Sequence, residues 1–180
     1  MERQEAETRL LDAAEALFYR RGVQAVGMDD LRAASGVSLK RLYGTFPSKE
    51  ALVTAYLERR DLRWTADLET YVAARDDSVA AVFDWLGEWF ASDDFHGCAF
   101  INAFGELREG ATPVAAAARA HKERLLRFLR GLVKDDVLAA QLVMLMDGAI
   151  VSASINGDPG AAATARKAAE ALVGGGVTRR

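Results

Sequence analysis

Residues 36–52 read Gly36-Val37-Ser38-Leu39-Lys40-Arg41-Leu42-Tyr43-Gly44-Thr45-Phe46-Pro47-Ser48-Lys49-Glu50-Ala51-Leu52. Gly36 ends a short segment that has two acidic residues in its first turn, so a helix is expected over 28–35. Ser38 is a favoured N-cap for a second short helix over 39–46, which Pro47 ends. Two short helices joined by a turn that contains glycine predict a helix-turn-helix.

Helical periodicity continues along the rest of the chain, because apolar residues recur at steps of three and four. Strand-like alternation is nearly absent. We expect seven further helices, over 5–21, 48–74, 78–91, 98–107, 113–133 and 135–155, with a last one that follows the separating segment 156–159 and ends near 173. About nine helices without a sheet predict an all-α fold.

The composition is that of a folded protein in a reducing compartment. Of the 180 residues, 51% are hydrophobic and 27% are charged, which excludes a disordered chain. The single cysteine excludes an internal disulfide or a multi-cysteine metal site. The charged N-terminus is unlike a signal peptide. We therefore expect a cytoplasmic protein with no metal and no cofactor.

Basic residues gather in the stretch that contains the helix-turn-helix. The net charge of the chain is −3, yet residues 31–49 hold four basic side chains and no acidic one. Such a local field attracts phosphate even on an acidic protein. The charge alone is equally compatible with a solvated basic face that has no partner.

The periodicity of the two short helices separates a buried from an exposed face. Five residues are expected to face inward against Leu17 and Phe18: Leu31, Ala34, Val37, Leu42 and Phe46. The exposed remainder of the second helix has the size and polarity of a reader of the DNA major groove. Spacing alone is a weak indication, because many helical hairpins do not bind DNA.

The stretch quoted above resembles the signature of the TetR family of bacterial transcriptional regulators, in which G-V-S, L-Y and F-x-S-K-E-x-L recur at this spacing. The resemblance covers about residues 5–58. It implies a three-helix DNA-binding head over 1–47 and a helical ligand-binding and dimerisation domain over 48–180. It also implies a homodimer that binds palindromic double-stranded DNA and responds to a small hydrophobic or amphipathic ligand.

The resemblance further implies the residues that contact DNA. Ser38 lies at the N-cap of the recognition helix, and Leu39, Lys40 and Arg41 occupy its base-facing positions. Arg41 fits a bidentate guanine contact. The implied set is Ser38, Leu39, Lys40, Arg41, Tyr43, Gly44, Thr45 and Lys49, with Tyr43 and Lys49 on the phosphate backbone. Tyr43 could instead pack on Pro47. Gly27 departs from the family pattern, which often has a threonine there.

The segment 137–155 contains a single charged residue, Asp147, in nineteen positions. Its length would permit a membrane span, but its polar residues make insertion costly, so no membrane association is expected. A helix that is apolar all round must be covered on both sides. We expect a subunit interface that includes Leu125, Leu129, Leu138, Leu142, Ala149 and Ala153.

Seven of the fifteen aromatic residues lie between Phe83 and Phe104. Such a cluster could line a ligand pocket or form an ordinary aromatic core. The resemblance favours the pocket, for which we expect Trp64, Phe83, Trp89, Phe100, Asn102, Phe104, Glu106 and Asp147. Cys98 is interpreted as a buried structural cysteine rather than a redox sensor, and His121 as solvated.

Two other classes of protein are alternatives to a regulator. No nucleophile elbow, phosphate-binding loop or metal-ligand spacing is present, so we do not expect an enzyme. The second alternative is a helical small-molecule-binding or interaction protein without sequence-specific DNA binding. The prediction is a DNA-binding, ligand-responsive transcriptional repressor.

Overall fold

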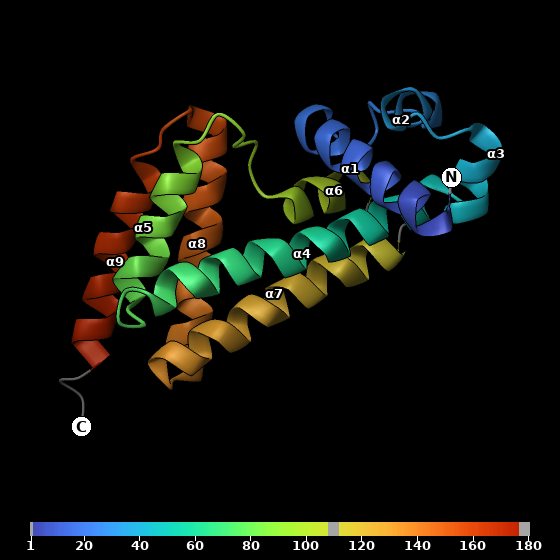
Figure 1. Cartoon of the computed structure of the whole chain (residues 1–180). Coiled ribbons are helices and arrows are strands. Elements are labelled where there is room, and N and C mark those ends of the chain that lie inside the picture. The colour runs from blue at the N-terminus through green and yellow to red at the C-terminus, as the bar shows by residue number, and fades with distance from the viewer. Residues whose placement is uncertain (1, 108–111, 177–180) are drawn as a thin grey trace. The chain divides into compact units, whose positions relative to one another are not determined.

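The computed structural model describes residues 2–107 and 112–176, and these residues form nine helices and no strand (Figure 1). The prediction of an all-α fold is confirmed. The helices are α1 (Arg3–Arg21), α2 (Met28–Ser35), α3 (Leu39–Thr45), α4 (Lys49–Ala73), α5 (Val79–Phe90), α6 (Ala99–Leu107), α7 (Thr112–Val133), α8 (Asp136–Asn156) and α9 (Ala161–Gly176).

Side-chain caps mark the starts of α3, α4 and α8, as they do at Ser78 before α5. The Ser38 hydroxyl accepts a hydrogen bond from the Arg41 N–H at 3.4 Å, and the Ser48 hydroxyl accepts one from the Ala51 N–H at 3.1 Å. At the start of α8, the Asp135 carboxylate accepts from the Leu138 N–H at 2.8 Å. Each cap supplies an acceptor to an N–H group that has no partner within its helix.

The chain divides into two compact units, which are described separately. The head unit comprises Met1–Leu62 with Ala99–Ala120, and the bundle unit comprises Arg63–Cys98 with His121–Arg180. The long helices α4 and α7 contribute to both. These units describe packing, so the expected division of function between residues 47 and 48 stays a prediction.

The head unit buries the inward face of its short helices as expected, with one exception. Leu31 and Val37 are buried, and so are Leu42 and Phe46 on α3. Ala34 is exposed, so its predicted inward position was wrong. The buried face of α2 is the one that Leu31 and Ser35 share at a spacing of four residues, and Ala34 lies outside it.

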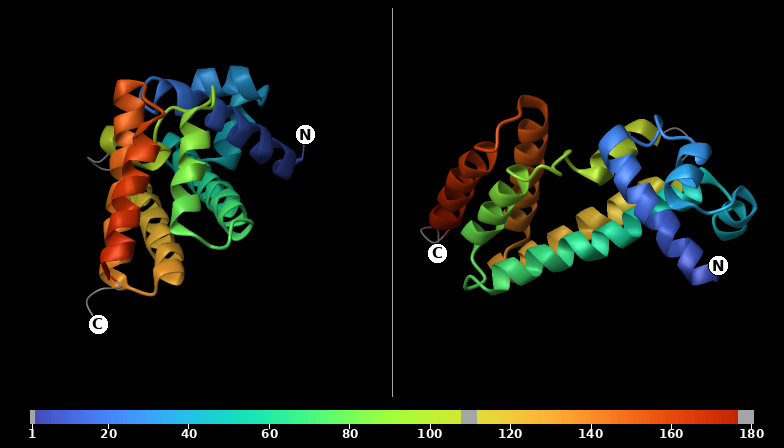
Figure 2. Two further views of the ribbon diagram at one scale, coloured as in Figure 1. Left: turned by 90° about the vertical axis from the view of Figure 1, so that its left-hand side faces the viewer. Right: turned by 45° about the horizontal axis from the view of Figure 1, so that its top comes forward.

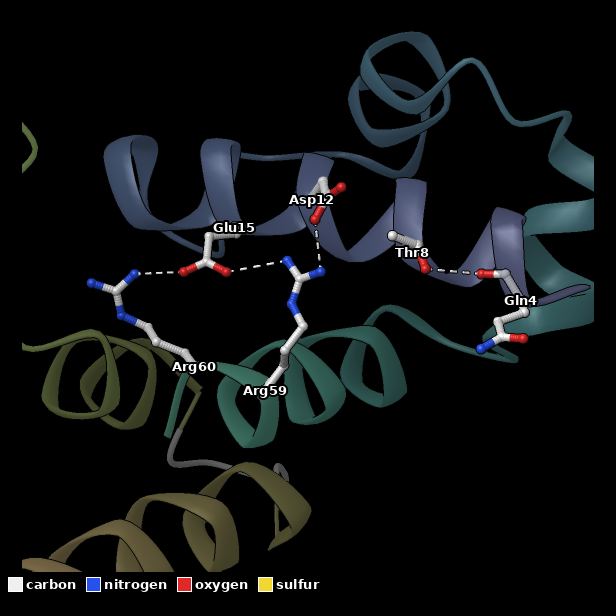
Figure 3. A network of polar contacts seen from close by, with 6 residues as sticks. All are labelled: Gln4, Thr8, Asp12, Glu15, Arg59 and Arg60. Atoms are coloured by element: carbon white, nitrogen blue, oxygen red, sulfur yellow. Dashed lines mark hydrogen bonds and ion pairs between the residues drawn. The ribbon is translucent and has the colours of Figure 1, made fainter. Parts of the chain in front are cut away.

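A network of ion pairs fixes α1 against α4 within the head unit (Figure 3). The Arg59 guanidinium donates to Asp12 at 2.7 Å and to Glu15 at 3.1 Å, and the Arg60 guanidinium donates to Glu15 at 2.8 Å. Arg60 also lies over the Tyr19 ring, 3.7 Å from its centroid. These charged hydrogen bonds hold α1, the helix that precedes the helix-turn-helix, against the first half of α4.

In the bundle unit, α5, α8 and α9 pack side by side, as Figure 1 and the right view of Figure 2 show. Alanines of α9 face the other two helices and are buried, and the small side chains permit a close approach. A Cβ at Gly87 of α5 would lie 3.5 Å from the Ala162 Cβ of α9. Arg166 of α9 adds an ion pair with Asp84 of α5 at 2.5 Å.

Candidate nucleic-acid interface

The buried residues of α3 determine which of its side chains face outward. Leu42 is completely buried and Phe46, the residue that follows the helix, is nearly so. The opposite face is therefore turned to solvent. It carries most of the predicted DNA-contact residues in exposed positions: Ser38, Leu39, Lys40, Arg41, Tyr43 and Gly44. Thr45 is half-buried.

Two of these residues use their hydroxyl groups locally. Ser38 caps α3, as described above, and the Thr45 hydroxyl donates to the Arg41 carbonyl oxygen at 2.9 Å. Tyr43 is 47% exposed, so about half of its side chain is accessible to a partner. A Cβ at Gly44 would meet no atom within 4 Å, so the centre of the outward face is bare backbone.

Lys49, the first residue of α4, is half-buried. Burial lowers the pKa of its ammonium group, and the nearby Glu106 and Asp30 carboxylates, which raise that pKa, only partly offset the effect. Lys49 therefore stands close to two carboxylates. A phosphate that approaches Lys49 must compete with them.

Two acidic residues of the head unit, Asp30 and Glu106, make hydrogen bonds that were not predicted from the sequence. The Asp30 carboxylate accepts a hydrogen bond from the Gly27 N–H at 2.8 Å, which is the half of a capping box that the N3 side chain supplies. The spacing of Asp30 three residues after the N-cap could have indicated this. Glu106 contacts Gln24 across 82 residues of sequence, and no local pattern indicates that contact.

The residues predicted to line a ligand pocket fall into both units. Trp64, Phe83, Trp89 and Asp147 belong to the bundle unit, whereas Phe100, Asn102, Phe104 and Glu106 belong to the head unit. Asn102 and Phe104 are exposed, and Phe83 and Phe100 are buried. Asp147 pairs with Lys122 of α7. The pocket stays a prediction.

The bundle unit does contain a connected group of aromatic rings. The Trp64 ring lies 4.8 Å from Trp85 and 5.6 Å from Trp89, and Phe95 lies 5.0 Å from Trp89, measured between centroids. His121 is 1% exposed and stands 5.4 Å from Trp64, so the expectation that it is solvated was wrong. His121 lies on the buried face of α7, where its ring packs beside Trp64 of α4. Cys98 is buried.

Most residues predicted for the subunit interface are buried within their own unit: Leu125, Leu129, Leu142, Ala149 and Ala153, while Leu138 is half-buried. The exposed apolar residues of α8 form a different stripe. Val137, Met144, Val151 and Ile155 recur at steps of seven, seven and four and lie on one face. By length and composition α8 could cross a membrane, a property it shares with core helices of soluble proteins; a third of that apolar window is buried.

The three-helix head with an exposed basic face on α3 defines a helix-turn-helix DNA-binding protein. The sequence pattern described as "Bacterial regulatory proteins, tetR family" matches residues 10–56. A TetR-family transcriptional regulator from Streptomyces coelicolor has a similar structure, with a TM-score of 0.85 and 31% identity over 94% of this chain and 95% of that one. A TetR transcriptional regulator from Streptomyces avermitilis matches at a TM-score of 0.78 and 32% identity, over 92% of this chain and 98% of that one.

A curated relative, an uncharacterized HTH-type transcriptional regulator of Mycobacterium tuberculosis, is 41% identical over 68 residues, which are 38% of this chain and 34% of the relative. The match thus spans about a third of that relative's length. The chain belongs to the TetR family of transcriptional regulators, a family of soluble DNA-binding proteins and not of enzymes. The predicted family and regulatory function are confirmed.

Proposed function

We propose that the protein is a cytoplasmic, ligand-responsive transcriptional repressor that binds a palindromic operator as a homodimer. The observation that carries the proposal is the outward surface of α3, where Lys40 and Arg41 are exposed while Leu42 is buried. A helix fixed to the core by one face, with cations on the other, is suited to the major groove.

Within this proposal the eight residues of the DNA-contact set divide into two roles. Leu39, Lys40 and Arg41 face the bases, and Arg41 binds guanine through its guanidinium. Gly44 and Thr45 bring the backbone of α3 close to the groove. Ser38, Tyr43 and Lys49 contact phosphates and fix the register of the helix.

The homodimer is proposed to form through the exposed stripe on α8. Met144 is 72% exposed and Ile155, about three turns further along the same face, is 77% exposed, an unusual state for large apolar residues. Gly148 lies within the same stripe and would allow close helix packing, since nothing surrounds its Cβ position. On α9, Ala168, Ala171 and Leu172 are also exposed. A two-fold pair would read two half-sites.

The ligand is proposed to be small and hydrophobic or amphipathic, and to bind beside the aromatic rings around Trp64 and Trp89. Helix α6, which belongs to the head unit, follows this aromatic segment in the chain, and its Glu106 accepts a hydrogen bond from the Gln24 N–H. Ligand binding would favour a conformer with lower operator affinity, with a coupling free energy of about 1–3 kcal/mol.

Selection of bound duplexes from random DNA by the full-length protein tests the proposal. We expect a palindromic sequence that binds on the order of 10³-fold more tightly than random DNA, with an affinity that falls steeply as salt rises. Two half-sites and a complex of two chains per duplex are the expected composition. A protein that selects no duplex would instead be a helical small-molecule-binding or interaction protein.

A further inference from the structure

Leu39 is a large apolar side chain in the middle of an otherwise polar and basic surface. It is 43% exposed, whereas Leu42 in the same helix is fully buried. Among the described residues of the head unit, four large hydrophobic side chains are exposed: Leu39, Tyr43, Leu62 and Phe104. Two of these four lie on α3, one turn apart and therefore on one face.

The chemistry of leucine restricts what this position can recognise. Its side chain has neither a hydrogen-bond donor nor an acceptor, so it cannot read the polar edges of guanine, cytosine or adenine. The apolar feature that the major groove displays is the C5-methyl group of thymine. From this exposure and this chemistry we infer that Leu39 determines specificity by contacting the methyl group of one thymine in each half-site.

The surroundings of Leu39 fit that assignment. Lys40 and Arg41, which follow it on α3, supply the charge that holds the helix in the groove. Neighbouring Ser38 uses its hydroxyl oxygen as a cap, which fixes the first turn of the helix and the direction in which Leu39 projects. Because Leu39 contributes little to the core, its substitution tests recognition without unfolding the head.

The inference rests on the proposed function, and one experiment separates the two. Each thymine of the selected duplex is replaced in turn by deoxyuridine, which removes only the C5-methyl group. We expect one position per half-site at which this change weakens binding by the wild type about fourfold, or about sixteenfold when both half-sites are changed, the effect of one buried methyl group per contact.

The Leu39→Ala variant, combined with the thymine-to-deoxyuridine change, completes a double-mutant cycle between protein and DNA. This variant should bind the thymine duplex more weakly than the wild type does and should bind the thymine and uracil duplexes equally. Leu62→Ala is the matched control, because Leu62 is 61% exposed and lies on α4 outside the recognition helix. This variant should keep the full difference in affinity between the thymine and uracil duplexes. Unchanged melting temperatures check that both variants fold.

The outcomes that overturn the inference are distinct from failure of the proposed function. If the wild type selects a duplex and no uracil substitution weakens its binding, Leu39 does not read a methyl group. The same conclusion follows if Leu39→Ala keeps the difference between thymine and uracil. If the wild type selects no duplex at all, the proposed function fails and the assignment of Leu39 fails with it.

Discussion

Gln24 and Glu106 are joined by two hydrogen bonds, and Gln24 is the donor in both. The Gln24 N–H donates to Glu106 Oε2 at 2.7 Å, and the Gln24 side-chain amide donates to the Glu106 carbonyl oxygen at 2.5 Å. A Cβ at Gly22 would lie 3.0 Å from Glu106 Oε1, so the missing side chain makes room for the carboxylate. Helix α6 is thereby attached to the turn that leads into α2.

Glu106→Ala should lower the free energy of unfolding by about 0.5–1.5 kcal/mol, because it removes an acceptor of a charge-assisted hydrogen bond and frees the end of α6. The urea midpoint of the full chain measures the effect. Glu123→Ala, on the exposed face of α7, is the control and should change the midpoint little. Equal midpoints for the two variants would show that the Gln24 contact contributes nothing.

Glu15→Ala should destabilise the protein by about 1–2 kcal/mol, because Glu15 accepts hydrogen bonds from both Arg59 and Arg60 and all three are largely shielded from water. Glu5→Ala breaks a single exposed pair with Arg9 and should cost no more than about 0.5 kcal/mol. Thermal unfolding in low and high salt compares the two variants. A larger effect at Glu5 would contradict the role given to the α1–α4 network.

Met144→Glu and Ile155→Glu should each convert the proposed dimer into monomers, since a carboxylate would be buried without a partner in the interface. Sedimentation equilibrium measures the mass in solution. Leu62→Glu places the same charge on an exposed leucine of α4 and should leave the mass unchanged. Wild-type protein that sediments as a monomer would refute the interface.

Arg41→Ala should weaken operator binding by about 1–3 kcal/mol and relax the base preference at one position of each half-site. Lys49→Ala should weaken binding to all sequences alike and reduce the salt dependence by about one unit of slope per subunit. Titrations of operator and random duplexes at several salt concentrations separate the two effects. If Arg41→Ala leaves both affinity and preference unchanged, another residue reads the base.

Gly44→Ala should affect folding and DNA binding in opposite directions. Alanine favours the helix by about 0.5–1 kcal/mol over glycine and meets no atom within 4 Å, so the melting temperature should rise. The added methyl group would prevent the closest approach of α3 to the groove, so operator affinity should fall. Gly131→Ala, in equally open surroundings on α7, should raise stability without changing DNA affinity.

Local signals along the chain predicted the elements of this fold well. Ser38, Ser48 and Asp135 were expected at helix starts, and each accepts a hydrogen bond from the first turn of its helix. The buried positions of Leu42 and Phe46 followed from the same periodicity. Caps and periodicity act within a few residues, so the sequence itself records them.

The sequence by itself thus determined the nine helices found in residues 2–107 and 112–176, the helix-turn-helix and the residues that α3 presents to solvent, because spacing and capping are local properties. Only the tertiary structure decided which face of α8 the core occupies, that His121 is buried beside Trp64, and that Glu106 binds Gln24. These facts depend on which surfaces meet after the chain has folded. An all-round apolar helix such as α8 has no periodic signal that distinguishes its two faces, so the packing of α5 and α9 alone leaves the Val137–Ile155 stripe exposed.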